Sequence, residues 1–178
     1  MKIQKTAFKG LKIIIGKIYY DSRGFFREIY KKKILKSHRP IFWCTSKSKK
    51  NVLRGLHLQT RNTQEKFVSV INGKILDVVV DVRSKSKTFG KHFKIILSDK
   101  NAKSLLIPAG FAHGFCGLEK ENLVFYGCTN YRSKKNEIGI LWKDKNLDIK
   151  WPLTNAIVSK KDQNCLELKS VIKKLRNK

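Results

Sequence analysis

The sequence predicts an all-β fold, in which short strands build a sandwich or barrel and a short C-terminal helix completes the chain. Two observations lead to this prediction. Runs of β-branched and aromatic residues, separated by turn residues, recur over the first two-thirds of the chain, as in β-sandwiches and barrels. The apolar residues near the C-terminus then change to a helical spacing. Because 178 residues can bury one sizeable core, we expect a single domain over residues 1–178.

The predicted strands follow one another with short connections. They lie at residues 11–15, 25–30, 67–71, 74–82, 92–97 and 122–126. A turn at 21–24 separates the first two strands. The pair Asn72-Gly73 stands between two of the strands and predicts a tight hairpin, because both turn residues of such a hairpin take positive φ.

The C-terminal helix is predicted from one apolar face. Its members are spaced three, four and three residues apart, and they are Cys165, Leu168, Ile172 and Leu175. Ser159 and Asp162 stand before it at the spacing of a capping box, although Glu or Gln is usual in the place of Asp162. Asp162 could therefore cap a helix, serve in catalysis, or do both.

Charge is the most unusual feature of the composition. Forty Lys and Arg residues against 13 Asp and Glu give a formal net charge of +27. The excess is mostly lysine scattered over polar positions, not an arginine-rich stripe interleaved with aromatic residues. We therefore expect no nucleic-acid partner. A small anionic substrate accounts for the positive charge as well as a nucleic acid would.

The apolar runs and the cysteines bear on location. The longest apolar runs are short, as at 78–80, so we expect no membrane span. The N-terminus lacks the continuous apolar core of a secretory signal. Four cysteines without a C-x-x-C pair are typical of free thiols in a reducing compartment. We expect a cytoplasmic protein.

Two histidine segments, 54–59 and 108–113, each combine a turn with the start of a strand. Together they resemble the two motifs of metal-binding cupins, which are small jelly-roll barrels. The four metal-ligand positions of that frame carry His57, Gln59, Lys66 and His113. A lysine ammonium has no lone pair and repels a divalent cation, and Gln is a weak neutral ligand. We therefore expect a cupin jelly-roll barrel without a metal, whose pocket is suited to proton transfer.

A narrower resemblance extends over nearly the whole chain. The motifs that carry it stand in register at 21–28, 46–48, 51–59, 77–83, 88–90, 107–115 and 159–162. They resemble the dTDP-4-dehydrorhamnose 3,5-epimerase family. Members of that family are metal-free dimeric cupins, which need no cofactor and invert carbons beside the keto group of a nucleotide-linked 4-keto-6-deoxy sugar. The resemblance implies such an epimerase in deoxysugar or surface-polysaccharide biosynthesis.

The resemblance implies four catalytic residues, and each has a structural alternative. His57 matches the base, although a buried His is often a satisfied core residue. Asp162 matches the carboxylate that orients this imidazole, beside its possible role as a helix cap. Lys66 matches the cation near the keto oxygen, although most lysines are solvated. Tyr126 matches the acid that returns a proton from the opposite face, although a strand Tyr is often a core residue.

The resemblance also implies residues that bind the substrate. The positions are Arg23, Phe26, Glu28, Arg54, Gln59, His113 and Lys161. The arginine and lysine positions match contacts to the diphosphate, and those at 26 and 28 match contacts near the nucleotide base. In the family, the residue at the position of Arg23 is typically delivered by the partner subunit, so a homodimer is implied. His113 lines the pocket, and its role stays open.

Two departures from the family pattern concern the substrate. The chain has Phe42-Trp43-Cys44 where relatives usually have Gln-Asp-Asn, and Arg132 where a second aromatic residue is frequent. Alternatives are therefore an epimerase of a GDP-linked 4-keto heptose, an enzyme that inverts C3 only, and a cupin sugar-nucleotide isomerase. A non-catalytic binding cupin is a further alternative, from a different class of function.

Overall fold

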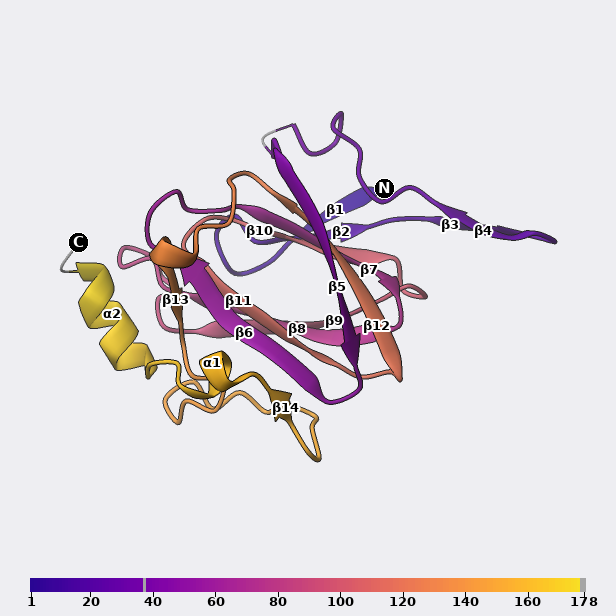
Figure 1. The fold of residues 1–178 in the computed structure, drawn as a ribbon. Helices are drawn as coiled ribbons and strands as arrows, with labels where there is room; N and C mark the ends of the chain where they lie inside the picture. The colour runs from indigo at the N-terminus through magenta and orange to yellow at the C-terminus, as the bar shows by residue number, and fades with distance from the viewer. Residues whose placement is uncertain (37, 177–178) are drawn as a thin grey trace.

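Two sheets form the body of the molecule in a computed structural model that describes residues 1–36 and 38–176 (Figure 1). The first sheet has six strands in the order β1 (Lys2–Lys5), β2 (Lys12–Ile15), β10 (Lys103–Ile107), β7 (Lys66–Asn72), β12 (Glu121–Cys128) and β5 (Phe42–Lys49). The second has the order β13 (Glu137–Gly139), β6 (Val52–Gln59), β11 (Phe111–Gly117), β8 (Lys74–Asp81) and β9 (His92–Ser98), and β14 (Ile157–Val158) pairs with β6. The prediction of an all-β fold is confirmed.

The remaining elements lie outside the two sheets. β3 (Ile18–Asp21) and β4 (Gly24–Arg27) form a hairpin that projects from the barrel, as Figure 1 shows. A 3₁₀ turn at Lys134–Asn136 and a short helix, α1 (Lys160–Gln163), precede the C-terminal helix α2 (Leu168–Arg176). The predicted helix is therefore present, but Cys165 lies before its first turn. No helix in the described ranges is long and apolar enough to cross a membrane.

Burial on both faces explains the apolar run in β8. Ile75 and Val79 belong to the core between the sheets, together with residues of β7, β10 and β12. Val78 and Val80 pack on the opposite side with residues of the C-terminal segment, including Val171 of α2. A strand covered on both faces requires apolar residues at successive positions, and each fully buried Val contributes about 1.5–3 kcal/mol.

The predicted hairpin at Asn72-Gly73 is wrong. β7 pairs with β10 and β12, whereas β8 pairs with β9 and β11, so the turn carries the chain from one sheet to the other. Gly73 has the positive φ that the pair predicts, at +86°. Side chains accept hydrogen bonds from the backbone N–H groups of this turn: Gly73 N donates to Asp99 Oδ2, and Lys74 N donates to Asn122 Oδ1, both at 3.0 Å.

Candidate active site

A pocket of about 600 Å³ opens between the two sheets. Residues of β5, β7 and β12 line it from the first sheet, and residues of β6 and β11 line it from the second. Seven of the side chains predicted from the sequence lie on its wall: Arg54, His57, Lys66, His113, Tyr126, Lys161 and Asp162. The fold therefore brings together positions that are far apart in the chain.

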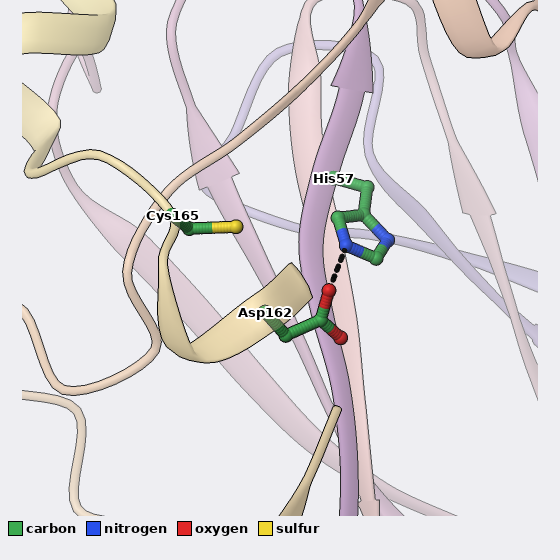
Figure 2. Close-up of side chains that lie close together, drawn as sticks. All are labelled: His57, Asp162 and Cys165. Carbon is green, nitrogen blue, oxygen red and sulfur yellow. Dashed lines mark hydrogen bonds and ion pairs between the residues drawn. The ribbon is translucent and has the colours of Figure 1, made fainter. Parts of the chain in front are cut away.

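His57 and Asp162 form a hydrogen-bonded pair, shown in Figure 2, with 2.7 Å between His57 Nε2 and Asp162 Oδ1. Asp162 Oδ2 accepts the backbone N–H of Gly55 at 3.2 Å. The side chain of Asp162 is 6% exposed and that of His57 is 24% exposed. Burial raises the pKa of Asp162, but the hydrogen bond and charge of His57, the Gly55 amide and Lys161 outweigh burial and leave this pKa lowered.

The backbone around this pair explains its geometry. Ser159 caps α1, since its hydroxyl accepts the N–H of Asp162 at 3.1 Å. This cap uses the backbone N–H of Asp162 and leaves its carboxylate free to bind His57. Asp162 can therefore belong to the capped turn and pair with His57 at the same time. Gly55 has a φ of +115°, and a Cβ there would lie 2.5 Å from the Cα of Gly114 in β11. This close approach of β6 and β11 requires a glycine.

A second imidazole–carboxylate pair lies on the neighbouring strand. His113 faces His57 in the register of β11 and β6, and its Nε2 lies 2.8 Å from Asp77 Oδ2. The His113 side chain is 5% exposed, and that of Asp77 is fully buried. Among the residues described, Asp77 Oδ1 has no hydrogen-bond partner.

Tyr126 lies on the wall that the first sheet provides. Its hydroxyl is 2.9 Å from the hydroxyl of Ser46 on β5, and its ring meets the His113 ring edge-on, with 6.4 Å between centroids. Burial, together with the charge of Asp77, raises the pKa of Tyr126 against the opposing effect of Ser46. The phenol therefore stays protonated at neutral pH.

Lys66 is the cation inside the pocket. Burial lowers its pKa below the usual 10.5, and the charges of Cys128, Glu137 and Asp77 oppose this shift. The neighbouring carboxylate, Glu65, is bound to His38 Nδ1 at 2.6 Å. No carboxylate of the described residues forms an ion pair with Lys66, so its ammonium is available to an anionic group in the pocket.

Three further cations line the pocket, and all three are exposed, so they form its rim: Arg54, Arg132 and Lys161. Arg54 is oriented by Ser48, whose hydroxyl accepts from its Nε at 2.9 Å. Arg132 and Lys161 both bind Glu137. Burial raises the pKa of Glu137, but the hydrogen bonds from these two cations lower it to about 2. The pocket therefore has a cationic rim, which suits a phosphorylated ligand.

Four of the predicted residues lie elsewhere in the single chain. Gln59 does not line the pocket. Its side chain binds backbone instead, donating to Asn62 O at 2.8 Å and accepting from Ser133 N at 2.6 Å. The other three, Arg23, Phe26 and Glu28, belong to the region of the β3–β4 hairpin. Phe26 is 64% exposed, and the side chain of Arg23 is 88% exposed.

The side chains at the four metal-ligand positions of the cupin frame serve other interactions. His57 and His113 are each paired with a carboxylate through Nε2. Gln59 is held by backbone groups, and Lys66 offers a cation. Because Lys66 cannot ligate a cation and the amide of Gln59 is already bound, these four side chains together do not form a divalent-metal site.

Sequence reasoning missed three residues of the site: Ser46, Asp77 and Glu137. For Asp77 a signal existed, since a single carboxylate inside a strand of buried apolar residues requires a partner. For Ser46 the only signal was its place in the quoted motif, because a strand serine is ordinary. Glu137 has no local signal, since its two cations lie five residues before it and 24 residues after it.

The comparisons with known proteins agree on one family. The sequence profile of the family described as dTDP-4-dehydrorhamnose 3,5-epimerase matches residues 5–170. A protein of that name from Shigella flexneri is 42% identical over 170 residues, which cover 92% of this chain and 94% of the relative.

Solved structures give the same result. The dTDP-6-deoxy-D-glucose-3,5-epimerase of Legionella pneumophila, in complex with dTDP-4-keto-L-rhamnose, has a TM-score of 0.92 and 40% identity, covering 98% of this chain and 96% of its own. The dTDP-4-dehydrorhamnose 3,5-epimerase of Bacillus anthracis, with TDP and pyrophosphate bound, has a TM-score of 0.89 and 40% identity, covering 94% and 99%. The predicted cupin jelly roll is confirmed. This chain belongs to the dTDP-4-dehydrorhamnose 3,5-epimerase family.

Proposed function

We propose that this protein inverts C3 and C5 of a TDP-linked 4-keto-6-deoxy sugar through an enolate intermediate. One observation carries the proposal: His57 on β6 and Tyr126 on β12 line a single pocket from opposite sheets. Inversion needs a base on one face of the carbon and an acid on the other, since one base alone only exchanges the proton. Two walls that each carry a proton-transfer group satisfy this requirement.

His57 is the proposed base. With Nε2 donating its hydrogen to Asp162, the lone pair of neutral His57 lies on Nδ1, which is then the nitrogen that removes the proton. Asp162 holds this tautomer and stabilises the imidazolium that forms. The lowered pKa of Asp162 supports the assignment, because an ionised carboxylate is required for this role.

Lys66 is the proposed stabiliser of the enolate oxygen. Removal of a proton beside the 4-keto group moves negative charge onto that oxygen, and a cation in a pocket shielded from water stabilises it strongly. The free ammonium of Lys66 supports this role.

Tyr126 is the proposed acid. A phenol held neutral by burial can donate its proton to the enolate carbon, and Ser46 orients the hydroxyl. We assign His113 a positioning role, because its Nε2 is occupied by Asp77 and its ring packs edge-on against Tyr126. We assign Gln59 a supporting role in the loop that it binds, instead of contact with the substrate.

The nucleotide diphosphate binds at the rim in this proposal. Arg54 and Lys161 supply charge-assisted hydrogen bonds, and Arg132 adds a third cation where relatives frequently have an aromatic residue. The relatives that bind dTDP-4-keto-L-rhamnose and TDP support a TDP-linked hexose over the GDP-linked heptose. Phe42 and Cys44 also line the pocket, so the departures from the family pattern lie where they could alter preference for the sugar.

The test of the reaction is incubation with dTDP-4-keto-6-deoxyglucose in deuterated water, followed by NMR. Deuterium at C3 and C5 and an inverted product are expected. Deuterium at C3 alone would replace the proposal by a C3 epimerase. Exchange only with GDP- or UDP-linked 4-keto sugars, used in parallel, would change the substrate, and exchange with none of them would refute an epimerase.

A homodimer completes the site in this proposal. Arg23 and Phe26 are exposed on a projecting hairpin, and the half-buried Glu28 lies at its base, where the three side chains can reach a second copy of the pocket. Mixing His57→Asn with Arg23→Ala subunits tests this. Delivery between subunits predicts recovered activity in mixed dimers, because one of the two pockets then has both native residues. No recovery in verified mixed dimers, or a monomer in light scattering, contradicts it.

We also propose a cytoplasmic location. All four cysteines are free thiols, which supports a reducing compartment. Cell fractionation with an antibody against the chain tests this, and enrichment in an extracytoplasmic fraction would contradict it.

A further inference from the structure

Cys165 lies beside the proposed catalytic pair without a role in the reaction. One imidazole nitrogen of His57, one carboxylate oxygen of Asp162 and the thiol Sγ of Cys165 all lie within 4.8 Å of one another. Figure 2 shows the thiol directed toward the imidazole from the segment that follows α1. Nitrogen, oxygen and sulfur donors in this combination are the ligands that zinc takes in proteins.

The backbone holds these three side chains in place. Gly139 of β13 faces His57 in the sheet, and Leu166, next to Cys165, donates its N–H to Gly139 O at 3.3 Å. A Cβ at position 139 would collide with Cys165 Sγ and would approach His57 Cδ2 to 3.4 Å. The glycine therefore gives the thiol its place against the imidazole, and the three donors come from hydrogen-bonded elements rather than from a free loop.

We propose that His57, Asp162 and Cys165 form an inhibitory binding site for a thiophilic divalent cation such as Zn²⁺. Binding releases the thiol proton of Cys165 to solvent. One thiolate and one carboxylate then balance the two charges of the cation, and water takes the fourth position. Tetrahedral zinc requires ligand atoms about 3.3–3.6 Å apart, so the pair at 2.7 Å opens slightly and Cys165 moves inward by rotation of its side chain.

The inhibition follows from the tautomer of His57, and in this respect it rests on the proposed function. A cation on Nε2 replaces the hydrogen that Asp162 accepts, so the imidazole proton moves to Nδ1. Nδ1 then has no lone pair with which to remove a proton from the substrate. His57 and Asp162, which form the proposed catalytic pair, therefore also ligate the cation that inactivates the base.

The other two thiols near the pocket do not offer such a site. Cys44 and Cys128 line the pocket, but among the described residues neither belongs to a group of three closely spaced His, Cys, Asp or Glu side chains. Cys44 is therefore the matched control for Cys165, because both thiols are half-buried and only Cys165 lies beside the His57–Asp162 pair.

The first test measures binding without turnover. Metal-free protein is titrated with Co²⁺, and we expect one cation per chain and a near-ultraviolet thiolate charge-transfer band. Cys165→Ser should remove the band and weaken Zn²⁺ binding at least about 10-fold, since even changes outside the ligands cost 10- to 100-fold. Cys44→Ser should retain both. A band that survives in Cys165→Ser, or that is lost in Cys44→Ser, refutes the site.

The second test uses the unmodified protein, so it does not depend on how a variant folds. Zn²⁺ should slow alkylation of Cys165 by iodoacetamide and leave the rate at Cys44 unchanged, as followed by mass spectrometry. Equal rates at Cys165 with and without Zn²⁺ would overturn the proposal.

Inhibition is tested last, by solvent exchange of the substrate. Zn²⁺ should inhibit the parent and Cys44→Ser at similar concentrations and Cys165→Ser only at concentrations at least about 10-fold higher. Equal inhibition of all three refutes an inhibitory role for this site. If the protein catalyses no exchange at all, the proposed function fails, while the cobalt and alkylation results still decide whether the cation site exists.

Discussion

The two imidazole–carboxylate pairs of this protein differ in access, not in geometry. His57–Asp162 and His113–Asp77 have nearly equal N···O distances, 2.7 and 2.8 Å, and the two histidines face each other across β6 and β11. The side chain of His57 is 24% exposed, whereas that of His113 is 5% exposed. A hydrogen-bonded histidine and carboxylate therefore do not by themselves identify a catalytic base.

The origin of the two carboxylates adds to the difference. Asp162 comes from α1, outside the sheets, and also accepts the amide of Gly55. Asp77 comes from β8, inside the second sheet, and the structure gives its Oδ1 no partner among the described residues. The first pair can respond to a ligand, and the second is enclosed in the wall that supports Tyr126.

The largest expected effect is on catalysis at His57. His57→Asn should reduce solvent exchange about 100- to 10,000-fold, the usual contribution of a general base, with little change in melting temperature because the side chain is partly exposed. The measurement is deuterium uptake by the substrate, followed by NMR, together with thermal unfolding. Exchange within a few-fold of the parent would remove His57 from the mechanism.

The next effect separates the pairs by stability. Asp77→Ala leaves a buried imidazole without its partner and should lower the free energy of unfolding by about 1–3 kcal/mol. Asp162→Ala should lower it less, because His57 can turn to solvent, but should cost more activity. Urea unfolding and exchange rates of the two variants check this. If the order of stability losses is reversed, the division between an accessible and an enclosed pair is wrong.

A smaller effect is expected in the pH profile. The pKa of Lys66 is lowered by burial, and the charge of Asp77 opposes that shift. Loss of the ammonium should therefore end activity on the alkaline side below pH 10.5. In Asp77→Asn the pKa of Lys66 falls further, so this limb of kcat/KM moves to lower pH. Asp162→Asn should leave its position unchanged, and a shift in Asp162→Asn alone would contradict the assignment.

The six strands predicted from the sequence all overlap observed strands, and seven of the predicted site residues line the pocket, but others of the strands, such as β1, β5 and β10, were not predicted. The errors have physical causes. The pair Asn72-Gly73 predicts a positive φ, which Gly73 has. A local backbone angle, however, does not determine which strands pair with each other. The turn therefore joins two sheets. Gln59 fits the cupin frame by spacing, yet its amide is used by backbone groups from positions 62 and 133, which only the fold brings near.

Contacts between distant positions were the hardest to predict from residues alone. Asp162 joins His57 across 105 positions, and it was predicted through the family resemblance rather than through spacing. Cys165 was assigned to a helix face, because its spacing to Leu168 is helical. The structure instead places it before α2 and beside His57.

The most direct test of the two-wall mechanism is Tyr126→Phe in deuterated water, with exchange and inversion at C3 and C5 measured in one NMR time course. We predict that exchange persists while inversion is strongly reduced, because His57 still removes the proton but no acid returns one from the other wall. Equal loss of exchange and inversion would contradict a base on β6 acting opposite an acid on β12.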